Sequence, residues 1–332
     1  MNTLLTVSEL RKHFPLKKDM LGRGGGTVHA VDGITFDVAQ GETLGVVGES
    51  GCGKSTMARL LVRLIEPDHG QIKLEGRAVG SAMPLTEARG KMQMVFQDSF
   101  ASLNPRLTIE DSIAFGPVVH GLPRAAARER ARSLLARVGL EPLRFAGRYP
   151  HELSGGQRQR VNIARALALR PRIVILDEAV SALDKSIEAQ VLNLLLDLKA
   201  EFGLTYIFIS HDLNVVRYMS DRIMVMYLGK IAEAGLAEAV FGNPRHPYTR
   251  ALFSAMPSMD PDRRTQQPPL AGDPPNPINP PPGCRFKGRC AHAEDICAKG
   301  DIALTSTGAE HRVACLMTQP GSGHSSAPAK AA

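Results

Sequence analysis

The stretch GESGCGKST, from Gly48 to Thr56, limits the folds open to this chain more than any other feature. It directly follows the short apolar run TLGVV, Thr43 to Val47. The pattern G-x-x-x-x-G-K-[ST] between a buried strand and a helix is typical of a phosphate-binding loop. The helix after the loop is predicted by an apolar stripe at helical spacing, formed by Met57, Leu60, Leu61 and Leu64.

The glycines of this loop let backbone N–H groups converge on phosphate oxygens, and the helix that follows adds the positive end of its dipole. Lys54 offers a positive charge to the β- and γ-phosphates, and Ser55 offers a hydroxyl to Mg²⁺. Cys52 stands where the loop needs a small residue, and we interpret it as structural. The predicted nucleotide-binding residues of the loop are Gly48, Ser50, Gly51, Cys52, Gly53, Lys54, Ser55 and Thr56.

Two acidic residues end a second apolar run, RIVILDE, Arg172 to Glu178. A carboxylate at the end of a strand can reach the Mg²⁺ held by Ser55, and we assign this role to Asp177. Glu178 is placed to orient or deprotonate an attacking water. By itself such a pair is more often a pair of solvated loop carboxylates, and the phosphate loop upstream favours the catalytic interpretation.

Apolar runs without alternation recur, as expected for parallel strands buried on both faces. LTYIFI, Leu204 to Ile209, is the third such run, and LGRGGG, Leu21 to Gly26, is a predicted flexible loop. The order of strand, helix and strand predicts an α/β phosphate-loop NTPase core with a parallel sheet. Before the third run, a helix is predicted by the apolar stripe of Ile187, Val191, Leu194, Leu195 and Leu198.

The chain divides into four parts. The nucleotide-binding core is predicted over 1–98 and 170–245, with LLTVSEL, GITFDV and GQIKLEG as short strands of an N-terminal antiparallel layer. Residues 99–169 are predicted to form an inserted helical subdomain, and 246–318 a proline- and cysteine-rich C-terminal extension. The run QQPPLAGDPPNPINPPPG should lie extended over a surface. Residues 319–332 are expected to be disordered.

A second candidate anion site is the string LSGGQRQR, which begins at Leu153. Ser154, Gly155 and Gly156 present a hydroxyl and backbone N–H groups at the start of a predicted helix. One chain with two phosphate-directed helix starts, each carrying half of the chemistry, indicates that two chains share each nucleotide.

The phosphate loop, Gln97 after MQMVF, LSGGQ, ILDE, SALD and FISHD follow one another as in the ATPases of ABC transporters, which this chain resembles over about residues 4–245. The resemblance implies ATP and Mg²⁺ as ligands, with Mg²⁺ bound by Ser55, Gln97 and Asp177. It implies that Gln97 also senses the attacking water and lies where membrane subunits dock. Contacts to the ATP of a partner chain are implied for Ser154, Gly155, Gly156 and Gln157.

Three further roles rest on the same resemblance. Asp184 of SALD would bridge the two ATPases, His211 of FISHD would contact the γ-phosphate, and Phe14 would stack on adenine. One position departs from the pattern, because Ala179 stands where similar proteins usually carry proline. This loosens the turn but removes no reacting group, so we expect Glu178, His211 and Gln97 to form a competent catalytic site.

The segments NPRHPYTRAL and LAGDPPNPINPPPGCRFKGRC resemble the C-terminal extension of oligopeptide and dipeptide importer ATPases. This implies a peripheral subunit at the cytoplasmic face of the cell membrane, paired with a second, often non-identical ATPase. The other implied partners are two integral membrane permease subunits and an extracytoplasmic substrate-binding protein. Related branches carry nickel, glutathione or opines, so the cargo stays open.

Two other classes remain as alternatives. A soluble ABC ATPase acting on nucleic acid or ribosomes would explain the twelve arginines and three acids between Leu122 and Arg172. Such proteins usually join two cassettes, and this chain has one phosphate loop; it also lacks tryptophan and has 5% aromatic residues, which argues against base stacking. We therefore expect no nucleic acid partner. A non-catalytic regulatory cassette would have lost Glu178 or His211.

Four of the five cysteines lie near the C-terminus, spaced C-x₅-C-x₆-C-x₁₇-C. The N-terminal residues lack the apolar stretch of a signal peptide, and a cytosolic address argues against structural disulfides. The spacing is wider than the C-x₂-C pairs of most structural zinc sites, whereas an iron–sulfur cluster accepts four thiolates from loops. The resemblance implies a 4Fe–4S cluster; Zn²⁺ and unligated thiols are the alternatives. The ligands would be Cys284, Cys290, Cys297 and Cys315.

Overall fold

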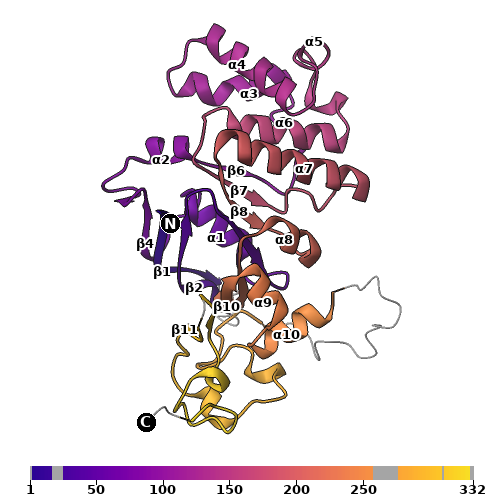
Figure 1. The fold of residues 1–332 in the computed structure, drawn as a ribbon. Coiled ribbons are helices and arrows are strands. Elements are labelled where there is room, and N and C mark those ends of the chain that lie inside the picture. Colours follow the sequence, from indigo (N-terminus) through magenta and orange to yellow (C-terminus); the bar gives the residue numbers. More distant parts are fainter. Residues whose placement is uncertain (1, 17–24, 257–275, 309, 330–332) are drawn as a thin grey trace.

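The protein is described by a computed structural model, in which residues 2–16, 25–256, 276–308 and 310–329 are placed. These residues form two sheets with helices around them (Figure 1). The larger sheet has the strand order β11-β12-β10-β9-β3-β8-β7-β6. Its parallel part confirms the predicted α/β core and consists of β3 (Thr43–Val47), β6 (Met92–Val95), β7 (Ile173–Asp177), β8 (Thr205–Ile209) and β9 (Arg222–Tyr227).

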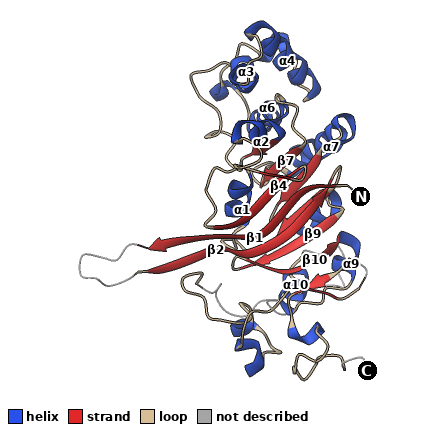
Figure 2. Ribbon diagram, turned by 90° about the vertical axis from the view of Figure 1, so that its left-hand side faces the viewer, coloured by secondary structure: helices blue, strands red, loops and turns tan. Residues whose placement is uncertain are grey.

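The smaller sheet is the predicted N-terminal antiparallel layer, with the order β2-β1-β4-β5. Its strands are β1 (Thr3–Leu16), β2 (Gly26–Ala39), β4 (His69–Leu74) and β5 (Arg77–Ala78). The first two are longer than predicted and form a hairpin that extends beyond the body of the protein (Figure 2). Its far end carries little buried apolar surface, so the hydrophobic pattern of the sequence could not reveal it. Residues 21–24 of the glycine-rich insert lie outside the described residues.

The helix after the phosphate loop, α1 (Lys54–Leu61), packs between the two sheets. Met57, Leu60 and Leu61 are fully buried there, as predicted. Leu64 does not continue the stripe: the helix ends at Leu61, and 54% of Leu64 is exposed. In α7 (Lys185–Phe202) the predicted apolar stripe faces the core along its whole length.

The helical subdomain is inserted between β6 and β7 and lies at the top of Figure 1. It contains α3 (Ile109–Val119), α4 (Arg124–Arg137), α5 (Pro142–Phe145), η1 (Pro150–Glu152) and α6 (Gly155–Leu167). The remaining core helices are α2 (Leu85–Lys91), which precedes β6, and α8 (Leu213–Met219), which follows β8.

The arginine-rich segment has a structural role within this subdomain. Arg165 donates to the carbonyl of Ser102, and Arg130 donates to the carbonyl of Ala168 at 3.0 Å. Other arginines pair with carboxylates, among them Arg128 with Asp111 and Arg132 with Glu110. Much of the positive charge is thus used to join helices and loops.

The C-terminal extension packs against β10 (Lys230–Leu236), which pairs with β9 in antiparallel orientation. Helices α9 (Ala237–Gly242) and α10 (Pro247–Ser254) lead into it, and β11 (Thr305–Ser306) and β12 (Arg312–Val313) add to the sheet edge. Its short 3-10 turns are η3 (Lys287–Arg289), η4 (Asp295–Ala298) and η5 (Leu316–Thr318).

Two expectations about this extension can be compared with the structure. Of the proline-rich run, 266–275 lie outside the described residues, and Ile278 forms a β-bridge with Val28, so the described part does run extended along β2. Residues 319–329 are not free of contacts, contrary to our expectation of disorder. His324 is buried and its ring nitrogen Nε2 lies 3.0 Å from the carbonyl oxygen of His292.

Within the described ranges, no helix is long and apolar enough to span a bilayer.

Candidate functional site

The sheet brings the predicted site residues to one edge. Val46 at the end of β3 pairs with Ile209 of β8, and Ile209 pairs with Asp177 of β7. These strands are parallel, so the loops that leave their carboxyl ends start side by side. The phosphate loop, the Asp–Glu pair and the FISHD loop therefore meet at this edge.

The phosphate loop needs glycine at two positions because the chain passes close to other backbone. Gly48 has a φ of 150°, and a Cβ atom there would lie 2.2 Å from the carbonyl oxygen of Met226. Gly53 has a φ of 107°, and its Cβ would lie 2.1 Å from the carbonyl oxygen of Ala30. Both positions exclude larger residues by steric overlap and by backbone conformation.

The side chain of Lys54 lies within the phosphate loop. It is buried, and Nζ donates to the carbonyl oxygens of Gly48 at 2.7 Å and Glu49 at 3.0 Å. These acceptors hold the ammonium at the centre of the loop. Cys52 is 3% exposed, in keeping with its interpretation as a structural residue.

The predicted Mg²⁺ ligands on α1 and β7 are in direct contact. Ser55 Oγ donates to Asp177 Oδ1 at 3.0 Å. Asp177 is 3% exposed, and this burial raises the pKa of its carboxyl, while the hydrogen bond from Ser55 lowers it. A hydroxyl at the start of α1 and a buried carboxylate at the end of β7 are hard oxygen donors suited to Mg²⁺.

Two of the predicted catalytic residues, Gln97 and His211, converge on the carboxylate of the third, Glu178. Gln97 Nε2 donates to Glu178 Oε2 at 2.9 Å, and His211 Nδ1 lies 3.4 Å from the same oxygen. Glu178 has a φ of 49°, a left-handed conformation that is uncommon outside glycine. Its N–H donates to the carbonyl of Ile209 at 2.9 Å, and its carbonyl accepts from Ser181 Oγ at 3.0 Å. Backbone contacts thus fix the direction in which this carboxylate points.

The signature string forms a helix start that is separate from this edge. Ser154 is the N-cap of α6, accepts from the N–H of Gln157 at 3.3 Å, and donates its own N–H to that side chain at 3.0 Å. Gly156 leaves room for α7, since a Cβ there would lie 2.6 Å from Ile187 Cγ2. Both ribbon views place α6 in the helical subdomain, away from α1 (Figures 1 and 2). The fold does not bring the signature to its own phosphate loop.

The remaining predicted residues lie at the surface or beneath the site. Asp184 is exposed at the N-cap of α7, and Ala179 is 4% exposed behind Glu178. Phe14, on β1, is 36% exposed with the Lys12 ammonium 5.5 Å from its ring centre. It pairs across the hairpin with Val28.

The four C-terminal cysteines line one pocket at the centre of the extension, together with His246, Phe286 and His324. Burial raises the pKa of the Cys315 thiol to about 11 and also raises the pKa values of Cys284 and Cys290. Each of these three sulfurs also accepts from the backbone N–H two residues further along, which favours the thiolate.

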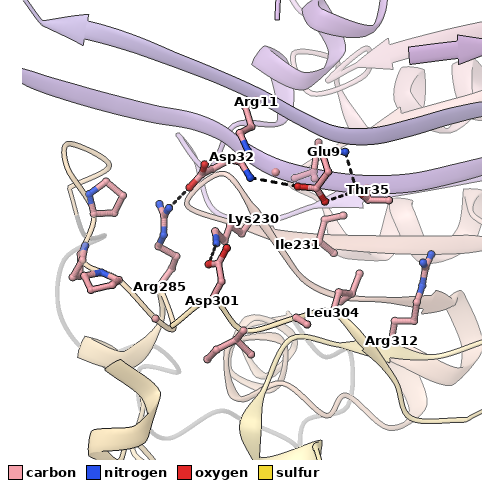
Figure 3. A pocket seen from close by; sticks show the side chains of 18 residues that line it. Glu9, Arg11, Asp32, Thr35, Lys230, Ile231, Arg285, Asp301, Leu304 and Arg312 are labelled. Atoms are coloured by element: carbon pink, nitrogen blue, oxygen red, sulfur yellow. Dashed lines mark hydrogen bonds and ion pairs between the residues drawn. The ribbon is translucent and has the colours of Figure 1, made fainter. Parts of the chain in front are cut away.

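Three side chains offer ligand atoms within 4.8 Å of one another only at His13, His29 and Asp32, as far as the described residues go. No three cysteine sulfurs are therefore as close as that. This cluster was missed in the sequence because His13 lies on β1, whereas His29 and Asp32 lie on β2. The Asp32 carboxylate is also paired with Arg285, so it is already neutralised by a guanidinium (Figure 3).

Two further groups of polar residues were missed. Buried Glu233 of β10 accepts from the N–H groups of Arg245 and His246, at 2.8 and 2.9 Å, and lies 2.6 Å from His311 Nε2. Glu49 of the phosphate loop is held by Arg289 of the extension. No local pattern in the sequence links Glu233 to Arg245 and His246, or Arg289 to Glu49.

A phosphate loop, an Asp–Glu pair and a Gln–His pair at the edge of a parallel sheet define a phosphate-loop ATPase. A family model described as "ABC transporter" matches residues 31–181, and one described as "Oligopeptide/dipeptide transporter, C-terminal region" matches residues 232–297. The oligopeptide transport ATP-binding protein AppF of Bacillus subtilis is 48% identical over 325 residues, covering 95% of this chain and 97% of AppF. The chain belongs to the ABC transporter ATP-binding family.

Further relatives and solved structures agree with this assignment. The dipeptide transport ATP-binding protein DppF of Escherichia coli is 46% identical over 316 residues, which cover 94% of both chains. Clostridium perfringens cbiO1, part of the ABC transporter complex cbiONQ, has a TM-score of 0.62 and 29% identity over 73% of this chain and 92% of its own. The ATP-binding cassette MJ0796, a post-hydrolysis dimer bound to ADP and Pi, has a TM-score of 0.61 and 28% identity over 70% of this chain and 99% of its own. The chain is an ATP hydrolase of this class.

Proposed function

We propose that this chain is the ATPase subunit of an ABC importer that takes up dipeptides or oligopeptides. The observation that carries the ATPase part is the convergence of Gln97 and His211 on the Glu178 carboxylate beside the phosphate loop. The cargo is supported by the match of residues 232–297 to the peptide-transporter C-terminal region and by relatives that carry oligopeptide and dipeptide transport in their names.

In this proposal the phosphate loop binds ATP through its backbone N–H groups, and Lys54 exchanges the carbonyls of Gly48 and Glu49 for phosphate oxygens. Ser55, Asp177 and Gln97 would hold Mg²⁺, which when bound neutralises charge on the phosphates. Phe14 would stack on the adenine. The surrounding burial of Asp177 makes a cation favourable there, since it offsets the unfavourable desolvation of the carboxylate.

Glu178 would act as the general base on the attacking water. Gln97 would orient this water, and His211 would contact the γ-phosphate. Both side chains already lie beside the Glu178 carboxylate, which would accept the proton. The left-handed backbone of Glu178 and its two backbone hydrogen bonds keep the carboxylate in place before ATP binds. Such preorganisation is how a general base contributes to the rate.

The first prediction concerns this base. Glu178→Gln keeps the size and hydrogen-bonding capacity of the side chain but cannot accept the proton, so ATP hydrolysis should fall about 100-fold or more while ATP still binds. Lys54→Ala should instead lose ATP binding. Exposed Glu238, in α9, offers a matched control, and Glu238→Gln should leave both properties unchanged. Steady-state hydrolysis and equilibrium binding measure them, and a Glu178→Gln protein with wild-type turnover would remove Glu178 from its role.

The site would be completed by a second ATPase subunit, whose signature helix would present the residues equivalent to Ser154, Gly155, Gly156 and Gln157. Asp184, exposed at the start of α7, would bridge the two subunits. We propose that the second ATPase is a non-identical homologue, and that the pair binds two membrane permease subunits at the cytoplasmic face of the membrane. An extracytoplasmic protein would deliver the cargo.

The second prediction concerns this cargo. A strain that requires one amino acid and lacks the gene should not grow when that amino acid is supplied only within a di- or oligopeptide. The wild-type gene should restore growth, and the gene with Glu178→Gln should not. Unchanged peptide uptake together with lost uptake of nickel, glutathione or an opine would contradict the peptide assignment and favour a related branch. Uptake of labelled peptide measures the difference directly.

We also propose that Cys284, Cys290, Cys297 and Cys315 hold a 4Fe–4S cluster. All four cysteines line one pocket, and four thiolates supplied by loops are a ligand set that an iron–sulfur cluster accepts. The N–H groups directed at three of the sulfurs suit thiolate ligands of iron. When bound, the cluster supplies cross-links that hold the extension together.

The third prediction is that anaerobically purified protein contains about four irons per chain and absorbs broadly near about 400 nm. Cys297→Ser should abolish both signals, because it removes one ligand. Cys52→Ser is the matched control, since this cysteine lies in the phosphate loop, and it should keep them. A colourless protein with one zinc per chain would favour zinc, and a metal-free protein would favour unligated thiols.

A further inference from the structure

Among the described residues, the C-terminal extension makes polar contacts with Glu49 of the phosphate loop from two side chains, Arg289 and Tyr248. Arg289 Nη1 lies 2.8 Å from Glu49 Oε2, and Arg289 Nη2 lies 3.1 Å from Oε1, so the guanidinium binds the carboxylate through both of its ends. The Arg289 side chain is 8% exposed and that of Glu49 is 20% exposed. This pair is shielded from water, and bidentate pairs of this kind fix geometry as well as contribute energy.

The second contact comes from α10. The N–H of Glu49 donates to the hydroxyl oxygen of Tyr248 at 2.9 Å. Tyr248 is fully buried, with its ring 4.4 Å from that of Tyr227 and 5.5 Å from that of Phe286. The aromatic packing leaves the hydroxyl little freedom, so it presents a fixed acceptor to the loop.

Glu49 is the residue after Gly48, at the start of the loop. Its carbonyl accepts from Lys54, its N–H is bound by Tyr248, and its carboxylate is bound by Arg289. All three polar groups of this residue are therefore occupied. When Lys54 turns from the carbonyl to a phosphate, Tyr248 still binds the Glu49 N–H and Arg289 still binds its carboxylate.

We propose that Arg289 and Tyr248 are positioning residues for ATP binding, through which the cysteine-bearing extension sets the affinity of the phosphate loop for nucleotide. Arg289 directly precedes Cys290, and Phe286 lies between Cys284 and Cys290. The segment that forms the thiol pocket thus also carries the contacts to Glu49. Among the described residues, neither Arg289 nor Tyr248 forms a hydrogen bond with Glu178, Gln97 or His211.

Buried Glu233 of β10 connects these contacts to the larger sheet. It binds the N–H groups of Arg245 and His246 at the start of α10, and His246 Nδ1 in turn accepts from the N–H of Tyr248 at 3.0 Å. A continuous chain of hydrogen bonds therefore runs from β10 through α10 to the phosphate loop. Its parts are rigid and buried, which is the arrangement that can carry coupling between two sites.

The test measures the dissociation constant of a fluorescent ATP analogue with the full chain. The dissociation constant should rise about fivefold or more in Tyr248→Phe, which removes one oxygen, and in Arg289→Gln. It should rise less in Arg289→Lys, because lysine keeps the charge but lacks the planar guanidinium. The KM for ATP should rise likewise while kcat changes much less, because Glu178, Gln97 and His211 are not contacted. A residue that acts only on overall stability would not split the two constants.

Two controls separate this proposal from general loosening of the extension. Arg312, on β12, also pairs with a carboxylate of the nucleotide-binding domain, since its Nη2 lies 3.7 Å from the half-exposed Asp37 Oδ1 on β2. Arg312→Gln should leave the dissociation constant within about twofold of wild type. If Arg289 acts through Glu49, the double variant Glu49→Gln/Arg289→Gln should bind as weakly as Glu49→Gln alone and no more weakly.

Wild-type affinity in folded Tyr248→Phe and Arg289→Gln proteins would overturn the proposal. So would an equal loss in Arg312→Gln, or additive losses in the double variant. Thermal unfolding verifies that each protein is folded; should Arg289→Gln fail to fold, Tyr248→Phe decides alone, since it removes one oxygen from an otherwise unchanged aromatic cluster.

Discussion

The whole site depends on the parallel pairing of three strands. β3, β8 and β7 lie side by side with Val46, Ile209 and Asp177 in register. Parallel strands buried on both faces must all leave the sheet at the same edge, and only there can polar residues escape the apolar core. The phosphate loop, the paired acids and His211 are therefore neighbours because of the fold, although 163 residues separate the first of them, Gly48, from the last.

Local backbone conformation and the C-terminal extension both shape the site at this edge of the sheet. Close backbone approach makes glycine necessary at Gly48 and Gly53, and left-handed backbone aims Glu178. The extension adds a layer behind the loop, with Glu49 as its point of attachment. The signature helix α6, in contrast, lies in the helical subdomain away from this loop, as expected if its start meets a nucleotide bound by a second chain, as we propose.

Much of the core could be predicted because its signals are local. An apolar run followed by a glycine-rich loop or by two acids marks a strand end, and Met57 and Val191 lie on the buried helix faces that the spacing predicted. The long hairpin of β1 and β2 could not be predicted, since its outer half buries little. Leu64 was misplaced because apolar spacing does not reveal where a helix ends.

The contacts between distant segments were out of reach of sequence reasoning. The number of cysteines and the expected cytosolic location predicted that the four C-terminal thiols lie together. Nothing in their spacing shows that Arg289, which lies between them in the sequence, contacts Glu49, 240 residues earlier. The same holds for Glu233, which reads as an ordinary strand carboxylate and is instead a fully buried acceptor for α10. Buried polar pairs of this kind are set by tertiary packing, which no local pattern encodes.

We propose that one chain holds only half of each ATP site. The decisive measurement is the specific activity of ATP hydrolysis, per chain, over a range of concentrations that spans assembly of the ATPase pair as followed by sedimentation. Activity per chain should be close to zero for the monomer and should rise in proportion to the fraction of paired subunits. A constant activity per chain, at the full rate and down to concentrations at which only monomer sediments, would contradict it.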